Sequence, residues 1–421
     1  MKLWRLAWTY LWSQPLTAAL NLLLLSLGLA AISFVMLVSE QIEAGVKRDL
    51  KGIDLVVGAK GSPMQILLSG VFHLDVPTSN IPLATLETLR AHPLVARAVP
   101  LSLGDSLRAY RLVGTTPQYL ELSASTLAQG RLWDAPMQAV LGAEVARELG
   151  LKLGDQFAST HGLGEQGDAH AGQPYTVVGI LEGSGAVLDR LVLTDLRSVW
   201  AAHEAHHPAA ASAAGGKHED HDEHHGEHGH GHGHEAEQPP REITLVLLTY
   251  RSPLAAISLP RWVNAQPGLQ ASAPALETAR LLRMVGAGEE VLKGFAAVML
   301  LSAGLSVFVA LLHAVRARQS DLAMMRMLGA PPWRVAALVS LEAMSLAALA
   351  AVLGLALGHG LAGLLGQLLA SQHSLPVSAW WWAAGEWLVL PLALGLALLA
   401  AAWPAWRAFR LDVTELLQAP R

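Results

Sequence analysis

The chain has 421 residues, a formal net charge of −5, 52% hydrophobic residues, 15% charged residues and no cysteine. Soluble domains usually carry roughly 25% charged residues, so this composition indicates apolar surface that does not face water. The lack of cysteine excludes thiol nucleophiles, disulfide frameworks, iron–sulfur clusters and zinc sites built on cysteine. A net acidic chain without a clustered basic face also argues against nucleic acid as a partner.

Residues 1–15 predict a short amphipathic helix that lies in the membrane interface. Its tryptophans recur every four residues beside two basic residues, as is typical of interfacial helices. These residues are Trp4, Trp8, Trp12, Lys2 and Arg5. A simple extension of the first membrane span is the alternative, but Pro15 favours a break between the two segments.

The first membrane span is predicted at residues 16–38, which carry no charged side chain. At ~1.5 Å per residue this length is enough to cross ~30 Å of hydrocarbon. A cleaved signal peptide is the competing interpretation. Its apolar region would be shorter, about 7 to 15 residues, and would end in a cleavage site of small residues.

Residues 39–290 lack any such apolar run and predict a large α+β domain in water. Short β-rich runs bounded by Gly or Pro predict strands at 54–59, 96–103, 107–115, 175–181, 243–250 and 269–273. Helical spacing of apolar residues predicts helices at 83–91, 141–149 and 253–265, and a further helix from residue 275 that leads into the second span.

A histidine-rich insertion, residues 203–240, interrupts this domain. Eleven of the chain's 18 histidines fall between residues 203 and 234, among several acidic residues. Imidazole is a common ligand for zinc, copper and nickel, so the composition indicates a low-selectivity, zinc-preferring tract. A solvated linker is the second interpretation, and a fixed catalytic site the third. The predicted ligands are His218, His221, His224, His225, His228, His230, His232 and His234.

Three further spans are predicted at residues 295–313, 335–369 and 387–406, followed by a tail at 407–421. The segments predicted to lie in the cytoplasm contain the basic residues, which are retained on that side of the membrane. They are Lys2, Arg5, Arg316, Arg318, Arg326, Arg334, Arg407, Arg410 and Arg421. The connection at 370–386 has no Lys or Arg, so both termini are predicted inside and the large domain outside.

Several local motifs resemble the permease subunits of MacB/FtsX-type (LolC/LolE-like) ABC transporters. The segment LAMMRMLGA at 322–330 resembles the cytoplasmic helix of that family, and WPAWRAFRLDVTELL at 403–417 resembles its closing segment. QAVLGAEVARELGLKLGD at 138–155 and YTVVGILEGSGAVLDRLVL at 175–193 look like its periplasmic core. The motif DLVVGAKGSPMQILLSGVFHLDVPTSNI at 54–81 resembles one recurrent subgroup.

The resemblance implies a permease subunit without catalytic activity. The sequence agrees, since it has no G-x-x-x-x-G-K-[ST] phosphate loop that could bind a nucleotide. ATP would then act only through a partner ATPase subunit, in an assembly of two permeases and two ATPases. Residues 316–334 would form the coupling helix that docks on the ATPase, although its arginines could also anchor to anionic lipid. The expected coupling residues are Arg318, Leu322, Arg326, Leu328, Gly329 and Arg334.

Two ionisable residues lie within the third span, where such groups are usually functional. Glu342 is expected to bond across to a neighbouring span or to the N-terminal helix, and His359 is the second such residue. A proton pathway would need more groups of this kind. Five glycines of this span permit close contact with span one or with a second permease copy. They are Gly354, Gly358, Gly360, Gly363 and Gly366.

These observations predict a helical membrane protein with four spans and a MacB-like α+β domain between the first two. The predicted function is ABC permease of the mechanotransmitting type, in a bacterial inner membrane. Expected partners are an ATPase, a second permease copy and a periplasmic protein. No cofactor is expected to bind firmly except Zn(II) at the histidine-rich insertion. The alternative function is a membrane-anchored metal sensor or scaffold that works without an ATPase.

Overall fold

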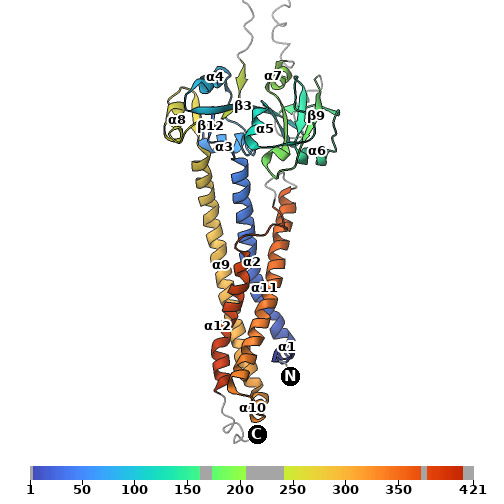
Figure 1. Cartoon of the computed structure of the whole chain (residues 1–421), viewed down its shortest axis with the longest axis vertical. Coiled ribbons are helices and arrows are strands. Elements are labelled where there is room, and N and C mark those ends of the chain that lie inside the picture. The colour runs from blue at the N-terminus through green and yellow to red at the C-terminus, as the bar shows by residue number, and fades with distance from the viewer. Residues whose placement is uncertain (1–2, 162–172, 205–240, 371–376, 411–421) are drawn as a thin grey trace, which may run out of the picture. The chain divides into compact units, whose positions relative to one another are not determined.

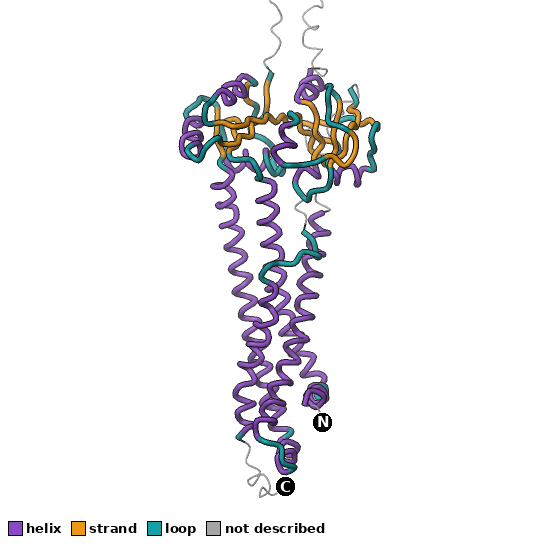
Figure 2. Tube along the Cα trace, in the orientation of Figure 1, coloured by secondary structure: helices purple, strands orange, loops and turns teal. Residues whose placement is uncertain are grey.

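A computed structural model of the chain describes residues 3–161, 173–204, 241–370 and 377–410 (Figure 1). The chain divides into two compact units. Unit 1 contains residues 1–44 and 282–421, and unit 2 contains residues 45–281. Figure 2 shows that the described part of unit 1 is helical and that the strands lie in unit 2.

Unit 1 is built from long apolar helices. In the described part of the chain, four helices are long and apolar enough to cross a membrane, namely α2, α9, α11 and the segment that contains η2 and α12. The elements are α1 (Leu3–Leu11), α2 (Pro15–Asp49), α9 (Pro274–Ala317), α10 (Gln319–Met327), α11 (Pro332–Ala370), η2 (Glu386–Leu388) and α12 (Val389–Phe409). Each predicted span lies inside one of these longer elements, except that the fourth, at 387–406, begins in η2 and continues in α12.

Proline sets two helix starts. Pro15 is the first residue of α2 and Pro332 is the first residue of α11. Proline suits the first position of a helix for two reasons. An N–H at that position would have no partner within the helix, and the fixed φ of proline is already helical. As a result, α1 and α2 are separate helices, and α10 and α11 are separate helices.

Helix α11 packs directly against α2 through glycine. A Cβ added at Gly354 would lie 2.8 Å from the Cβ of Leu29, and one added at Gly358 would lie 2.8 Å from Ser33 Oγ. Only the missing side chain allows this approach. The expected close contact of span three is therefore made with span one at these two glycines, whereas a Cβ at Gly360 would meet open space within 4 Å.

Unit 2 contains one large mixed sheet in the part that the structure describes. The strand order is β13-β1-β12-β3-β4-β10-β6-β9-β5, with β7 paired to β9 and β8 paired to β3. The strands are β1 (Leu55–Ala59), β3 (Val95–Leu107), β4 (Tyr110–Thr115), β5 (Leu127–Gly130), β6 (Gln138–Leu141), β7 (Gln156–Phe157), β8 (Thr160–His161), β9 (Tyr175–Leu181), β10 (Leu191–Asp195), β12 (Leu245–Tyr250) and β13 (Leu269–Ser272). A small second sheet pairs β2 (Ile81–Pro82) with β11 (Glu242–Ile243).

Short helices cover this sheet and bury its apolar residues in three clusters. They are α3 (Pro63–Gly70), α4 (Ala84–Ala91), α5 (Gln118–Ser123), α6 (Ala143–Leu149), η1 (Val187–Arg190), α7 (Leu196–Glu204) and α8 (Ala255–Asn264). Strand β3 joins the two halves of the sheet, because its first part pairs with β12 and its second part with β4.

The predicted fold class is confirmed: an α+β domain lies between the first two of four apolar helices. One predicted turn is displaced. The sequence favoured a break at residues 104–106, but β3 continues to Leu107 and the chain reverses at Arg108, whose φ is 54°. A register shift between Leu103 and Ser106 accommodates the break-forming residues as a bulge within the strand.

Candidate coupling site

Helix α10 exposes apolar side chains on one face. Leu322 and Ala323 are buried, whereas Met324 and Met327 are each 55% exposed and Leu328 is 83% exposed. Residues three to four apart share a helix face, so the two methionines and Leu328 form one surface. We call Met324, Met327 and Leu328 the α10 face.

The end of α10 is fixed by glycine and proline. Gly329 has a φ of 94°, a conformation that side-chain-bearing residues rarely adopt, and its N–H donates to the carbonyl of Arg326 at 3.0 Å. Pro332 then starts α11. Gly329, in the connection between α10 and α11, and Arg334, in the first turn of α11, are both exposed.

Arg318 does not join this exposed surface. It precedes α10, its side chain is only 13% exposed, and its Nη1 lies 3.3 Å from Glu342 Oε2. Its Nη2 donates to the carbonyl of Tyr10 at 2.7 Å and also to the Ser13 hydroxyl. The guanidinium stacks on the Tyr10 ring, 4.4 Å from the centroid. We call these four residues the Arg318 cluster.

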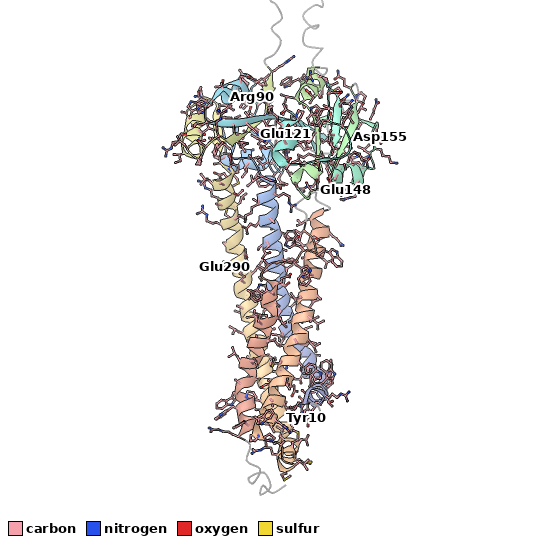
Figure 3. All side chains as sticks on the ribbon, viewed as in Figure 1. Tyr10, Arg90, Glu121, Glu148, Asp155 and Glu290 are labelled. Carbon is pink, nitrogen blue, oxygen red and sulfur yellow. The ribbon has the colours of Figure 1, made fainter. Side chains whose placement is uncertain are left out.

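The Arg318 cluster connects four parts of unit 1. Tyr10 belongs to α1, Ser13 to the link between α1 and α2, and Glu342 to α11, whereas Arg318 separates α9 from α10. Tyr10 is labelled in Figure 3, beside the start of the chain. Burial and then the negative charge of Asp321 raise the pKa of Tyr10, so its hydroxyl stays protonated.

His359 lies in a separate cluster. Its Nε2 is 3.0 Å from Glu386 Oε1, and its Nδ1 donates to the carbonyl of Ala379 at 2.6 Å. Glu386 Oε1 also accepts the Ser33 hydroxyl at 2.7 Å, and Oε2 accepts the N–H of Ala383 at 3.2 Å. We call these residues the Glu386 cluster.

The two intramembrane groups bond to different partners. Glu342 bonds to Arg318 and His359 bonds to Glu386. Seventeen positions along α11 separate Glu342 from His359, which corresponds to ~25 Å of helix. Both groups therefore tie helices together, each at its own level.

The chain between α11 and α12 is also fastened to α2. Gln41 Oε1 accepts the N–H of Ser378 at 2.7 Å, and Gln41 Nε2 donates to the Ser378 carbonyl at 3.1 Å. The N–H of Ala384 donates to Glu40 Oε2 at 2.9 Å. Together with the Glu386 cluster, these bonds hold residues 378–386 against one side of α2.

Two membrane helices lead into neighbouring strands of unit 2. Strand β1 follows α2, strand β13 precedes α9, and the two strands pair with each other from Val56 to Ala59. Within unit 2, the last turn of α2 also bonds to the loop before η1. Arg48 Nη1 donates to the Gly185 carbonyl at 2.6 Å, and Asp49 Oδ1 accepts the N–H of Val187 at 2.9 Å.

The predicted metal ligands, from His218 to His234, lie outside the described residues. Within the described ranges, no group of three or more His, Asp and Glu side chains could hold a metal ion. The metal hypothesis therefore rests on the composition of the insertion alone.

Of the six expected coupling residues, the structure turns Arg318 and Leu322 inward and leaves Leu328, Gly329 and Arg334 exposed; Arg326 is half-buried. Sequence reasoning missed Met324 and Met327, although helical periodicity relative to Leu322 would have placed them on the opposite face. It also missed Tyr10, Ser13 and Ser33, because no sequence signal links these residues to partners hundreds of positions away.

Comparison with known families agrees with this architecture. Residues 293–413 match the model of the FtsX-like permease C-terminal family, and residues 18–217 match that of the MacB-like periplasmic core domain. Comparison with curated proteins gives no match.

Solved structures share low similarity with the chain. The periplasmic region of MacB from Actinobacillus actinomycetemcomitans is 12% identical with a TM-score of 0.33, and the match covers 55% of this chain and 95% of that one. The extracellular domain of the ABC-type transporter YknZ from Gram-positive bacteria is 13% identical with a TM-score of 0.29, and the match covers 52% and 98% respectively.

The two family models together cover most of the chain, and they match in the order of the periplasmic domain followed by the last spans. The protein is therefore a membrane permease with a large domain inserted after its first span. It belongs to the MacB/FtsX-type permeases of ABC transporters.

Proposed function

We propose that this permease works with a separate ATPase subunit and passes nucleotide-driven motion to unit 2. The chain itself has no phosphate loop, so ATP hydrolysis needs a partner. The transmitted motion would serve export, lipoprotein release or remodelling of the cell envelope. The observation that carries the proposal is the exposed α10 face. Arg318, the central residue of the buried Arg318 cluster, directly precedes this helix in the chain.

The α10 face is the proposed docking surface for the ATPase. Met324, Met327 and Leu328 offer adjacent exposed apolar groups, and Arg334 lies just beyond them in the chain. Methionine adapts its shape readily and is common at binding surfaces. Gly329 and Pro332 fix the end of the helix, which limits how far it can move independently of α11.

The Arg318 cluster is the first proposed link in the transmission of motion from α10. Movement of α10 pulls on Arg318, which is bonded to α11 through Glu342 and to the end of α1 through Tyr10. From there, α2 and α9 run without interruption toward strands β1 and β13. At ~1.5 Å per residue, the 35 residues of α2 and the 44 residues of α9 reach well beyond ~30 Å of hydrocarbon.

The proposed location is the bacterial inner membrane, with both termini in the cytoplasm and unit 2 in the periplasm. The basic residues around α1, α10 and α12 support this orientation. A homodimer with two ATPases is the proposed assembly. The histidine-rich insertion is proposed to collect zinc near unit 2 through exchangeable imidazole and carboxylate ligands.

Co-purification tests the central proposal. The tagged permease is purified from its native cells, and we expect an ABC ATPase subunit to be recovered with it in equal amount. Met327→Asp together with Leu328→Asp should abolish recovery, because each carboxylate would need desolvation at an apolar contact. The matched control is Leu254→Asp in unit 2, where Leu254 is 63% exposed, and it should leave recovery unchanged.

Charge reversal at Arg326 and Arg334 is the second test and should also weaken recovery. If the permease purifies without any ATPase, the central proposal is refuted. If the ATPase is recovered equally with the parent and with the α10 variants, docking at α10 is refuted. The metal-sensor alternative would require function without any ATPase, and the match to two ABC permease families does not favour it.

A further inference from the structure

A groove of about 640 Å³ lies between α1, α10 and the first turns of α11. Its volume falls within the range of roughly 300–1,000 Å³ that is usual for small-molecule sites. Leu6, Met325 and Leu338 give it an apolar lining, and two charged side chains, Asp321 and Arg334, also border it. Two residues of the α10 face, Met324 and Leu328, also line the groove, whereas the proposed function leaves its side toward α1 unassigned.

The groove lies at one end of a membrane span. Leu338 is in the second turn of α11, which begins at Pro332. Two of the helices that line the groove carry exposed tryptophans, namely Trp333 on α11 and Trp4 and Trp8 on α1. Tryptophan concentrates at the level of lipid headgroups, so this groove lies within reach of a lipid headgroup.

The charges bordering the groove discriminate between lipids. Asp321 and Arg334 are both exposed, and the Arg334 guanidinium lies 5.5 Å from the Trp333 ring centroid. A purely anionic headgroup would satisfy Arg334 but would be repelled by Asp321. A headgroup with both a phosphate and a primary ammonium complements both side chains, because each forms a charge-assisted hydrogen bond.

We propose that this groove binds a phospholipid with an ethanolamine headgroup. The ammonium donates to the Asp321 carboxylate, the phosphate accepts from Arg334, and one acyl chain lies along Leu6, Met325 and Leu338. A choline headgroup fits less well because its methylated nitrogen has no N–H to donate. The bound lipid would brace α1 against α10 and would contact Met324 and Leu328, which belong to the surface where the ATPase is proposed to dock.

The test uses the full chain without any ATPase, so its outcome is independent of the docking proposal. The protein is reconstituted in nanodiscs with equal parts of ethanolamine, choline and glycerol phospholipids. It is then extracted into mild detergent, and the retained lipids are counted by native mass spectrometry. We expect about one ethanolamine lipid per chain, enriched about tenfold over choline lipid, as the loss of one charge-assisted hydrogen bond predicts.

Three variants locate the site. Asp321→Asn should remove the preference for ethanolamine over choline, Arg334→Gln should weaken retention of both, and Met325→Trp should fill the groove and reduce all retention. Glu290→Gln and Arg316→Gln are the matched controls, since both residues are exposed and neither borders the groove. These two controls should retain the lipid as the parent does.

One measurement needs no substitution and therefore no assumption about folding. Successive N-methylation of the ethanolamine lipid should lower its retention by the unmodified chain, most of all at the third methyl, which removes the last N–H. Equal retention of the ethanolamine and choline lipids would overturn the proposal. A preference for the glycerol lipid would overturn it too, and would indicate a contact with basic residues instead. Unchanged enrichment in both Asp321→Asn and Met325→Trp would likewise refute this site.

Discussion

Arg318 and Glu342 form a buried ion pair, 3.3 Å apart, between the junction of α9 with α10 and the third turn of α11. Their side chains are only 13% and 11% exposed. Arg318 is therefore a tie between helices rather than a contact for a partner, which separates it from the exposed residues of the same basic segment.

Arg318→Ala should destabilise the permease strongly. It leaves the Glu342 carboxylate buried without a partner, a change that typically costs about 3–5 kcal/mol. The double variant Arg318→Met with Glu342→Leu should recover most of this loss, because it removes both charges together. Thermal unfolding in mixed micelles measures the effect, with exposed Arg316→Ala as control. Equal destabilisation by the single and double variants would show that the ion pair is not the cause.

Gly358→Ala and Gly360→Ala should change stability in opposite directions. A methyl at Gly358 would lie 2.8 Å from Ser33 Oγ and 3.1 Å from the Ala30 carbonyl, so α11 would have to move away from α2. Overpacking of this kind costs about 1–3 kcal/mol. At Gly360 a methyl meets nothing within 4 Å, and alanine gains about 1 kcal/mol in helix propensity. Melting temperatures that fall equally in both variants would contradict this packing.

Glu386→Ala should release the connection between α11 and α12 without unfolding the helices. The carboxylate accepts from Ser33 and Ala383 and contacts His359, so its loss removes three contacts at once. Hydrogen exchange of residues 377–388 should rise, while exchange in α10 stays unchanged. Glu40→Ala is a matched comparison: it removes a single bond, to Ala384, and should have a smaller effect. Protection that is unaltered in Glu386→Ala would rule out this fastening role.

His73 should make the loop after α3 sensitive to acid. Its Nε2 lies 3.3 Å from the Tyr119 hydroxyl, and its buried Nδ1 has no hydrogen-bond partner among the described residues. Burial, followed by the positive charges of Arg111 and Arg190, lowers the pKa of His73 from 6.5 to about 3. The folded loop thus holds a neutral imidazole, whereas the opened loop takes up a proton below pH 6.5.

Stability of this loop is consequently complete above pH 6.5 and falls as the pH drops toward 3. The slope should approach about 1.4 kcal/mol per pH unit, the value for one proton. Hydrogen exchange of residues 71–80 at several pH values, corrected for intrinsic rates, reports the opening free energy. Asparagine at position 73 tolerates the φ of 54° and does not titrate. In His73→Asn the opening free energy should therefore depend on pH less steeply, by the contribution of one proton. Identical slopes would exclude His73 as the titrating group.

Deletion of residues 205–240, replaced by a short Gly-Ser linker, should leave folding and ATPase recovery intact. The segment interrupts unit 2 between α7 and β11, and its composition is polar and rich in glycine and histidine. Zinc titration of the full chain should show several weak sites that the deletion removes. Loss of assembly in the deletion would refute the view of this segment as an insertion. If the full chain and the deletion variant bind zinc equally, residues 205–240 are not the zinc ligands, and the interpretation as a solvated linker is favoured.

Local sequence already determined much of this protein. Hydropathy located the four spans because a bilayer demands about 20 apolar residues in succession. Pro15, Gly329 and Pro332 marked helix boundaries through the restrictions or freedom of their own backbone. The strand Tyr175–Leu181 was predicted to the residue from its β-rich content and its flanking turn. These features depend on neighbours within a few positions.

Tertiary structure decided which polar groups meet. The sequence showed Glu342 and His359 as two members of one set, yet one bonds to Arg318 and the other to Glu386. It presented Arg318 and Arg334 as equivalent basic residues, yet one is buried and the other is exposed. Partners such as Ser33 and Glu386 lie 353 positions apart in the chain. A membrane span must be apolar whichever face it buries, so hydropathy reveals that a helix crosses but not which side chains it brings together.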